Sequence, residues 1–185
     1  KLSGVGHVDF INSIWYRRTF TLPENWKDKR VILHFEAVDY STEVWINGKS
    51  VGTHEGGYSS FSFDITGTLT AGENVIIVCA DDDVRSELQP AGKQSYWYAS
   101  AGCSYTRTTG IWQTVWLEAV PKTYIEKLKI TPDLENGKVN ILATINGPSE
   151  DLKLAGKAML DGEVVGEASV SISAGIANTT ISIAE

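Results

Sequence analysis

Large apolar side chains alternate with small or polar ones at a period of two residues along much of the chain. This period is typical of β-strands, whose successive side chains point to opposite faces. Before residue 121 it predicts strands at residues 15–22, 31–36, 61–65 and 111–117, and a continuous apolar run that is too short for a helix predicts another at residues 75–80. Residues 24–30, which follow a strand-ending proline, read as a turn or a single helical turn. The pattern therefore predicts an all-β fold.

The segment 111–117 carries large side chains on both faces. Its odd positions hold Ile, Gln, Val and Leu, and its even positions hold Trp, Thr and Trp. A strand of this kind is usually covered on both sides, which favours an inner strand of a two-layer β-structure over a solvated edge. Gly110 opens the segment and Pro121 closes it.

Two tight turns are predicted with a defined geometry. In residues 44–51, Val-Trp-Ile-Asn-Gly-Lys-Ser-Val, the Asn47-Gly48 pair lies between two extended runs. Both residue types tolerate the positive φ that a two-residue hairpin needs, so these residues predict a β-hairpin. Asp161-Gly162 gives the same signal near the C-terminus.

The composition changes at Pro121. All six tryptophans and all five phenylalanines precede it, and every positive charge after it is a lysine. Such a shift indicates a domain boundary, so we expect one domain at residues 1–121 and a second at 122–185. In the second, alternation predicts five strands, at residues 125–130, 138–145, 152–160, 163–170 and 177–183. Five strands are fewer than the seven of a complete immunoglobulin-like sandwich, so this domain is expected to be incomplete.

Charge and hydropathy exclude several classes of partner. The chain of 185 residues has a formal net charge of -7 and a pI near 5.0, with no basic run. Nucleic acid favours clustered Lys and Arg, so it is not an expected partner. No apolar run approaches the roughly 20 residues that span a bilayer, and the N-terminus lacks a signal-peptide pattern.

Carboxylates are densest at Asp81, Asp82 and Asp83. Oxygen-rich sites suit Ca²⁺ or Mg²⁺. Consecutive residues at a strand end point in different directions, however, and no glycine-spaced calcium loop follows, which favours a solvated acidic turn in which Asp83 pairs with Arg85. Asp64 lies between apolar strand positions and is expected to bond nearby backbone rather than a substrate.

Histidines and cysteines give no metal pattern. His7, His34 and His54 are scattered and lack partners at metal-ligand spacing. Cys79 and Cys103 could form one disulfide or remain separate thiols, with Cys79 as a small core residue. We therefore expect neither a metal nor a cofactor.

A series of short motifs runs through residues 15–118. The first three are Trp-Tyr-Arg-Arg-Thr-Phe at 15–20, Phe-Glu-Ala-Val-Asp-Tyr at 35–40 and Val-Trp-Ile-Asn-Gly at 44–48. His-Glu-Gly-Gly-Tyr at 54–58 and Phe-Asp-Ile-Thr at 63–66 follow, and Thr-Gly-Ile-Trp-Gln at 109–113 with Val-Trp-Leu-Glu at 115–118 completes the series. Together these motifs resemble the amino-terminal sugar-binding domain of glycoside hydrolase family 2, which includes β-galactosidases, β-glucuronidases and β-mannosidases. Residues after 121 are similar in strand pattern to the immunoglobulin-like second domain of this family.

The resemblance implies a jelly-roll β-sandwich, like a galactose-binding domain, followed by an incomplete immunoglobulin-like β-sandwich. It also implies a retaining β-glycosidase, most similar to β-galactosidase, whose two catalytic glutamates lie on a TIM barrel beyond the second domain. No barrel fits in 185 residues, so this chain alone is expected to be inactive and to bind carbohydrate together with the barrel. Relatives that degrade polysaccharide outside the cytoplasm imply a periplasmic or secreted location.

One position departs from the family pattern. β-Galactosidases and β-glucuronidases carry an aspartate six residues before the glycine of the Gly-Ile pair, where it reaches the sugar. Here that position is Ser104, whose hydroxyl can bind a sugar hydroxyl but carries no fixed charge. The resemblance makes Ser104 a candidate substrate residue without an acidic role.

The long segment 81–105 holds the other candidate residues, because it has neither a two-residue nor a 3.6-residue period and long loops often carry function. Flat aromatic faces suit the C–H faces of sugar rings, and amide or basic groups can bond sugar hydroxyls. The candidates in this segment are Trp97, Tyr98, Tyr105, Lys93 and Gln94, and Arg107 directly after it is a further one. The competing interpretation is that these aromatics pack the loop against the sandwich or another domain.

Two other functional classes stay open. An independent carbohydrate-binding module or lectin would use the same aromatic loop without a catalytic partner, and a purely structural adhesion-type β-sandwich would not bind sugar at all. A reading frame that continues into a barrel separates the enzyme from both alternatives.

Overall fold

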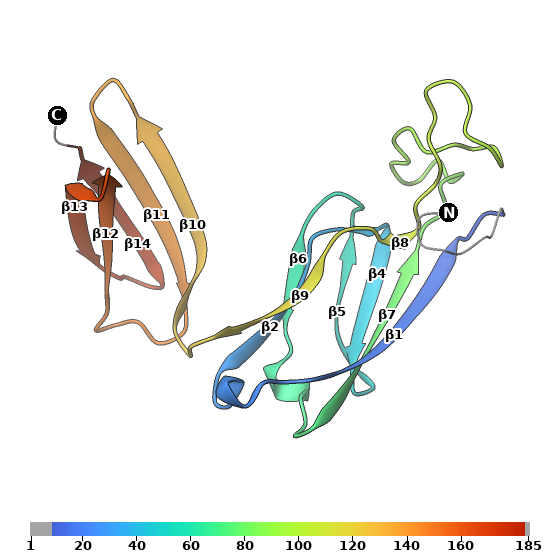
Figure 1. The fold of residues 1–185 in the computed structure, drawn as a ribbon, viewed down its shortest axis with the longest axis horizontal. Coiled ribbons are helices and arrows are strands. Elements are labelled where there is room, and N and C mark those ends of the chain that lie inside the picture. The colour runs from blue at the N-terminus through green and yellow to red at the C-terminus, as the bar shows by residue number, and fades with distance from the viewer. Residues whose placement is uncertain (1–8, 184–185) are drawn as a thin grey trace. The chain divides into compact units, whose positions relative to one another are not determined.

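A computed structural model of the chain describes residues 9–183 and consists almost entirely of β-strands (Figure 1). It divides into two compact units, Lys1–Ala119 and Val120–Glu185. The helical content of the described residues is two single-turn 3-10 helices, η1 (Glu24–Trp26) and η2 (Thr66–Thr68). The predicted all-β class is confirmed, and η1 falls within the predicted helical turn.

The larger sheet of the first unit has the strand order β1-β7-β4-β5. Its members are β1 (Ser13–Thr21), β4 (Ser41–Ile46), β5 (Lys49–Glu55) and β7 (Glu73–Asp81). All neighbouring strands are antiparallel, and β1 and β5 are the two edges. The continuous apolar run of β7 agrees with its inner position, where both faces of a strand are covered.

The smaller sheet has the order β6-β2-β9 and packs face to face on the larger one. It contains β2 (Arg30–Phe35), β6 (Phe61–Asp64) and β9 (Val115–Val120). A two-stranded ribbon, β3 (Val38–Asp39) with β8 (Gly110–Ile111), accompanies the sandwich. The first unit is therefore the predicted β-sandwich.

The core of the first unit lies between the two sheets. The face of β2 that the alternation predicts to be apolar, Val31, Leu33 and Phe35, is buried against Val44 and Ile46 of β4. Val38, Ile65, Val78 and Ala80 complete the buried cluster. Removing this apolar surface from water is the main stabilising contribution to the sandwich.

Residues 111–117 do not form the continuous strand that the alternation predicts. The strand ends at Ile111 and resumes at Val115. Between them, the N–H groups of residues 112 and 113 both point to the carbonyl of Ala37, at 3.4 Å each. The chain changes its pairing partner here, from β3 to β2, and this interrupts the ladder. Side-chain alternation does not reveal a change of partner, so the sequence could not predict the break.

The position of β9 also differs from the prediction, because the strand lies at an edge of its sheet and not inside it. Val115 and Leu117 pack on the core. On the opposite face, Trp116 stacks on His34 with ring centroids 4.0 Å apart, and its indole N–H donates to Glu36 at 3.0 Å. The strand thus has the composition of an inner strand and the position of an edge strand.

The predicted hairpin at Asn47-Gly48 is confirmed. Both residues have positive φ, 51° and 79°, and they join β4 to β5. The Asn47 side chain also donates to the buried Asn74 at 2.8 Å and accepts the Val75 N–H at 2.9 Å. These bonds attach the turn to the start of β7, so Asn47 serves both the turn and the sheet.

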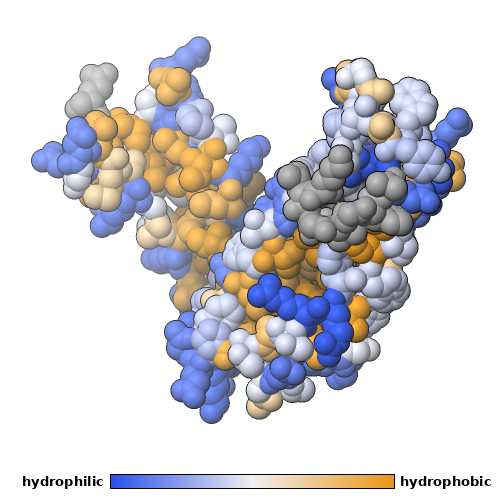
Figure 2. All heavy atoms as spheres, turned by 45° about the vertical axis from the view of Figure 1, so that its right-hand side comes forward, coloured by the Kyte–Doolittle hydropathy of each residue, from blue (hydrophilic) through white to orange (hydrophobic). Residues whose placement is uncertain are grey.

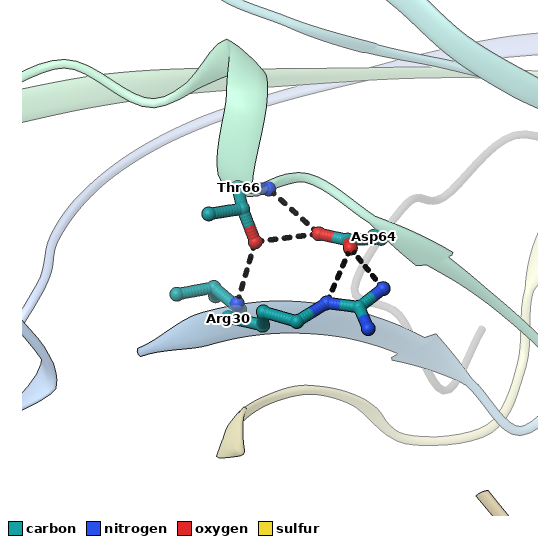
Figure 3. Close-up of polar contacts among 4 residues, drawn as sticks. Arg30, Asp64 and Thr66 are labelled. Carbon is teal, nitrogen blue, oxygen red and sulfur yellow. Dashed lines mark hydrogen bonds and ion pairs between the residues drawn. The ribbon is translucent and has the colours of Figure 1, made fainter. Parts of the chain in front are cut away.

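Asp64, the last residue of β6, forms a compact polar network with residues at the start of β2 (Figure 3). Its carboxylate accepts the Thr66 N–H at 3.0 Å and the Thr66 hydroxyl at 2.5 Å, while the Thr66 hydroxyl accepts the Val31 N–H at 2.8 Å. The Arg30 guanidinium donates two bonds to the same carboxylate, at 2.6 and 2.9 Å. Partial burial opposes ionisation, but the Thr66 and Arg30 contacts outweigh it and lower the pKa of Asp64. Asp64 therefore bonds local backbone, as predicted.

The second unit contains all five predicted strands. One sheet has the order β10-β11-β14, and β12 pairs with β13 in a hairpin. The strands are β10 (Tyr124–Asp133), β11 (Lys138–Asn146), β12 (Lys153–Leu160), β13 (Glu163–Ser171) and β14 (Ile176–Ser182). Asp161 and Gly162 have the positive φ predicted for the β12-β13 turn. The immunoglobulin-like topology of this unit stays a prediction.

The buried core of the second unit is small, with Ala143, Ile145 and Ala177 at its centre. Hydrophobic surface is visible on this unit at the left of Figure 2. The large apolar side chains that are exposed include Leu128, Ile130, Leu142, Met159 and Leu160. Small cores give little stabilisation per residue, so most of the burial that stabilises the chain belongs to the first unit.

The Asp64 network gives the first testable prediction. We expect Asp64→Ala to lower the free energy of unfolding of the first unit by about 1–3 kcal/mol, because two Thr66 donors and Arg30 lose their acceptor. Urea unfolding followed by tryptophan fluorescence reports this unit, since all six tryptophans lie in it. Ser62→Ala, on the same outward face of β6, is the control, and an equal loss in that variant would contradict the assignment.

Candidate functional site

Residues 82–109 connect β7 to β8 without a helix or strand. In Figure 1 this segment, coloured green to yellow, projects beyond the ends of both strands. Its two halves lie side by side: Ser95 N–H donates to the Tyr105 carbonyl and Tyr105 N–H donates to the Lys93 carbonyl, both at 2.9 Å. The predicted irregular loop is confirmed, and these bonds show that it has a defined fold of its own.

Gln94 is buried inside the loop, with 1% of its surface exposed. Its amide nitrogen donates to the Asp39 carboxylate at 2.9 Å, and its amide oxygen accepts the Thr108 N–H at 2.8 Å. Gln94 was predicted to bond a sugar, but burial and these two bonds leave it no surface for a ligand. The amide joins the ribbon strand β3 to the end of the loop.

Ser95 and Arg107 hold the aromatic part of the loop. The Ser95 hydroxyl donates to the Ala99 carbonyl at 2.8 Å and accepts the Trp97 N–H at 3.2 Å. The Arg107 guanidinium donates to the carbonyls of Ser95 and Trp97 and lies 4.0 Å from the centroid of the Phe10 ring. Arg107, also a predicted sugar ligand, uses these contacts within the protein and fixes the backbone beneath Trp97.

Asp82 is buried at the start of the loop, so the predicted solvated acidic turn is wrong for this residue, which is 2% exposed. Its carboxylate accepts the Gln89 amide at 2.6 Å and lies 3.4 Å from the Thr109 hydroxyl, so it ties the two ends of the loop together. Asp81 is exposed as predicted. The predicted partner of Asp83, Arg85, gives it a backbone N–H at 3.2 Å and not its guanidinium.

The two buried carboxyls of the site, Asp39 and Asp82, resist ionisation. Burial, followed by the charge of Asp39, raises the pKa of Asp82 to about 6. Burial also raises the pKa of Asp39, although the Gln94 hydrogen bond acts in the opposite direction. Two carboxyls near one another in a water-poor site disfavour a second negative charge.

Two glycines allow backbone to approach these groups. A β-carbon at Gly57 would overlap the Asp39 carboxylate. Gly110 has a φ of 86°, and a β-carbon there would overlap the Tyr16 hydroxyl, which accepts the Ile111 N–H at 3.2 Å. Only glycine fits either position, so both turns are built around the side chains that support the loop.

The exposed surface of this region is a set of aromatic side chains that we call the aromatic rim: Tyr58, Tyr96, Trp97, Tyr98 and Tyr105. Trp97 and Tyr98 are 62% and 69% exposed. Tyr58 comes from the Gly-Gly-Tyr segment before β6, and its hydroxyl lies 3.2 Å from that of Tyr105. That hydrogen bond, with burial and the nearby carboxylates, raises the pKa of Tyr58 to about 12, so Tyr58 keeps its proton at neutral pH.

The sequence pointed to Trp97, Tyr98 and Tyr105 as ligand-facing residues but missed Tyr58 and Tyr96. The signal for Tyr58 was the preceding Gly56-Gly57 pair, which permits a close approach of backbone. Trp112 donates its indole N–H to the Gly57 carbonyl at 2.8 Å and meets the Tyr58 ring edge-on. Trp112, just after β8 and more than fifty residues along the chain, thus helps to position Tyr58.

Ser104 lies in a turn of the same loop, half-buried, and its N–H donates to the Ala101 carbonyl at 3.0 Å. This turn precedes Tyr105, so the position that the resemblance marks as substrate-facing is adjacent in sequence to the aromatic rim. The Ser104 hydroxyl brings no charge to that place.

The structure also places the histidines and cysteines. His34 bonds Glu118 at 3.1 Å, and His54 bonds Ser59 at 3.0 Å and stacks on Phe61, whereas His7 lies outside the described residues. Within residues 9–183, no three His, Cys, Asp or Glu side chains could hold a metal together. Cys79 is buried and Cys103 exposed, and both are free thiols. No helix in the described part of the chain is long and apolar enough to cross a membrane.

Fold and site together define a β-sandwich domain with an aromatic, solvent-exposed rim on a firmly held loop, an arrangement suited to the faces of sugar rings. Residues 8–121 match the family model described as glycosyl hydrolases family 2, sugar binding domain. The chain belongs to this family, as the sequence motifs predicted.

Curated relatives carry two kinds of name. A putative β-glucuronidase of Formosa agariphila is 33% identical over 132 residues, which cover 71% of this chain and 15% of that protein. A β-galactosidase of Thermoanaerobacter pseudethanolicus is 33% identical over 156 residues, 83% of this chain and 19% of that protein. The chain therefore spans less than a fifth of the length of these relatives.

Two solved structures are similar to this chain. A putative β-galactosidase from Bacteroides fragilis superposes with a TM-score of 0.71 at 26% identity, covering 95% of this chain and 28% of that one. A β-glucuronidase of Bacteroides uniformis superposes with a TM-score of 0.68 at 25% identity, covering 94% of this chain and 22% of that one.

The raised pKa of Asp82 predicts how stability depends on pH. An aspartate in the unfolded chain titrates near pH 4, so between about pH 4 and 6 the folded state holds a proton that the unfolded state has released. Stability of the first unit should therefore fall as pH rises through this window and stay lower above it.

Asp82→Asn should flatten this pH dependence, because the amide does not titrate and can still accept from Gln89. Melting temperatures measured by tryptophan fluorescence at pH 4, 5, 6 and 7 test it. Asp81→Asn, one residue earlier and exposed, is the matched control and should keep the slope of the original protein. An unchanged slope in Asp82→Asn would rule out this carboxyl as its source.

Proposed function

We propose that this chain is the non-catalytic, sugar-recognising N-terminal region of a longer β-glycosidase, and that its aromatic rim contacts the carbohydrate bound by the catalytic domain. The observation that carries the proposal is the combination of a family 2 sugar-binding domain with Trp97 and Tyr98 exposed on a loop whose polar groups are used internally. The lengths of the relatives support a longer polypeptide.

The contacts of the loop explain why it suits recognition. Gln94, Ser95 and Arg107 fix its backbone before a ligand arrives, so little conformational entropy is lost on binding. The rim then offers flat apolar faces for sugar C–H groups, and the hydroxyls of the tyrosines and of Ser104 can bond sugar hydroxyls. Recognition of this kind needs neither a metal nor a cofactor.

Within the two activities named among the relatives, we propose a neutral galactoside as the substrate class. The Arg107 guanidinium, which lies beneath the rim, donates to the carbonyls of Ser95 and Trp97 and contacts the Phe10 ring, so it is engaged within the protein. A formal net charge of -7 also disfavours an anionic sugar such as a glucuronide. Serine at position 104 adds no charge.

An independent carbohydrate-binding module is the second candidate, favoured by the exposure of the rim in this chain taken by itself. Isothermal calorimetry of the chain with galactose and with glucuronate separates the two. Heat of binding at millimolar sugar would favour the module, whereas a silent titration is the outcome that we expect.

The enzyme proposal is tested on the full polypeptide that the gene encodes. We expect it to hydrolyse p-nitrophenyl β-galactoside faster than the β-glucuronide, and residues 1–185 alone to hydrolyse neither. A full polypeptide without β-glycosidase activity would overturn the proposed function, and a preference for the glucuronide would overturn the proposed substrate class.

The rim itself is tested by truncation. In the full polypeptide, Trp97→Ala should raise KM about two- to tenfold, because an aromatic contact contributes about 0.5–1.5 kcal/mol, and should leave kcat within about a factor of two. Leu88→Ala is the control, because Leu88 belongs to the same loop and is 96% exposed but is no part of the rim. Equal KM values in all three proteins would remove the rim from substrate binding.

A further inference from the structure

The two long sides of the first-unit sandwich differ. On the side formed by the edge strands β5 and β6, the sheets are in direct contact: His54 stacks on Phe61 with centroids 4.1 Å apart, and the Phe63 ring fills the space where Gly52 has no side chain. This seam is closed by side chains of the described residues. The opposite seam, between β1 and β9, has a different character.

Between β1 and β9 the sandwich opens into a groove of about 990 Å³. The walls include the half-buried side chains of Tyr16 and Phe20 from β1 and of Val115 and Leu117 from β9, and the fully buried Phe35 lies beneath them. Figure 2 shows hydrophobic surface on the first unit beside strongly hydrophilic side chains. The core beneath stays sealed from water, but the apolar walls remain partly exposed, which is unfavourable.

Both walls of this groove are edge strands. β1 ends the order β1-β7-β4-β5, and β9 ends the order β6-β2-β9. Each edge presents backbone N–H and C=O groups that are able to pair with a further strand. β9 has large side chains on both faces, the composition of an inner strand, so its sequence suits a position with a neighbour on each side.

Arg18 indicates the chemistry of that neighbour. In β1, the side chains of Tyr16 and Phe20 pack inward, so alternation places Arg18 on the same inward face and Arg17 on the outward one. Arg17 and Arg18 both border the groove and are exposed, but only Arg18 shares a face with Tyr16 and Phe20. Among residues 9–183 no carboxylate forms an ion pair with it. An arginine at the mouth of an apolar groove suits a partner that brings a carboxylate.

We propose that the groove between β1 and β9 receives an extended β-strand, six to nine residues long like its two walls, with apolar side chains alternating inward and a carboxylate opposite Arg18. The strand pairs with the free edge of β9 and closes the sandwich. This inference rests on the proposed function in one respect: the strand comes from the same, longer polypeptide.

A strand from the same polypeptide fits better than a second copy of the chain. The curated relatives are several times longer than this chain, which covers 15% and 19% of two of them. A second copy paired symmetrically through β1 would bring Arg17 and Arg18 of both copies together, and like charges across a strand pair are destabilising.

Hydrogen exchange tests the inference. In the full polypeptide, amides of β9 should exchange at least about tenfold more slowly than in residues 1–185 alone, because pairing protects an edge. Amides of the inner strand β7 serve as the internal reference. Equal exchange of β9 in both proteins would overturn the inference, and so would a full polypeptide no longer than 185 residues.

Two adjacent arginines give a matched pair of variants. In the full polypeptide, Arg18→Glu should lower the melting temperature of the first unit by about 4 °C or more and speed β9 exchange. Arg17→Glu should have a clearly smaller effect on both, because Arg17 also borders the groove but lies on the outward face of β1. In residues 1–185 alone, both variants should melt like the original. An equal loss for Arg18→Glu in the short chain would assign Arg18 to the sandwich itself and overturn the proposal.

Two further outcomes would also bear on the proposed strand. Concentration-dependent dimerisation of residues 1–185 with slow β9 exchange would make a second copy the occupant and contradict the proposal. The same experiments distinguish failure of this inference from failure of the proposed function. A full polypeptide that hydrolyses the galactoside but leaves β9 unprotected would refute only the added strand. One that protects β9 but hydrolyses no β-glycoside would refute only the proposed enzyme activity.

Discussion

The loop that carries the aromatic rim depends on one buried amide. Gln94 donates to Asp39 and accepts from Thr108, so a single side chain connects the ribbon strand β3, the middle of the loop and the approach to β8. Removal of either partner would leave a buried polar group without its hydrogen bond, which is more costly than the net value of the bond itself. Asp39, close to Gly57, also fixes the segment that carries Tyr58. The exposed rim is therefore ordered from beneath.

Most of the fold could be predicted from the sequence because it follows from local rules. Alternation placed Val31, Leu33 and Phe35 in the core, and the Asn47-Gly48 pair marked its hairpin. The errors concern information that one strand does not contain. The break after Ile111 arises from a change of pairing partner, and the edge position of β9 depends on which strands lie beside it. Register and neighbours are properties of the sheet and not of the segment.

The sequence identified the types of residue in the candidate site but not which of their side chains are exposed. Trp97, Tyr98 and Tyr105 are exposed on the loop, whereas Gln94 is buried and Arg107 bonds backbone carbonyls. A polar residue in an irregular segment has no periodicity that separates an inward from an outward side chain, so amide and guanidinium groups that build a loop look like groups that bind a ligand. Asp82 is a further example, because nothing in the run Asp81-Asp82-Asp83 indicates that its middle carboxylate is the buried one.

The short break at residues 112–114 joins the ribbon under the loop to the edge of the smaller sheet. Before it, β8 belongs to the ribbon that supports the loop; after it, β9 is a wall of the groove, and Trp112 itself bonds the segment that carries Tyr58. Trp112, which contacts Tyr58 of the aromatic rim, thus lies three positions before the first residue of β9. Linkage is reciprocal: a strand in the groove that strengthened carbohydrate binding at the rim by some factor would itself be bound more tightly, by the same factor, when the rim is occupied.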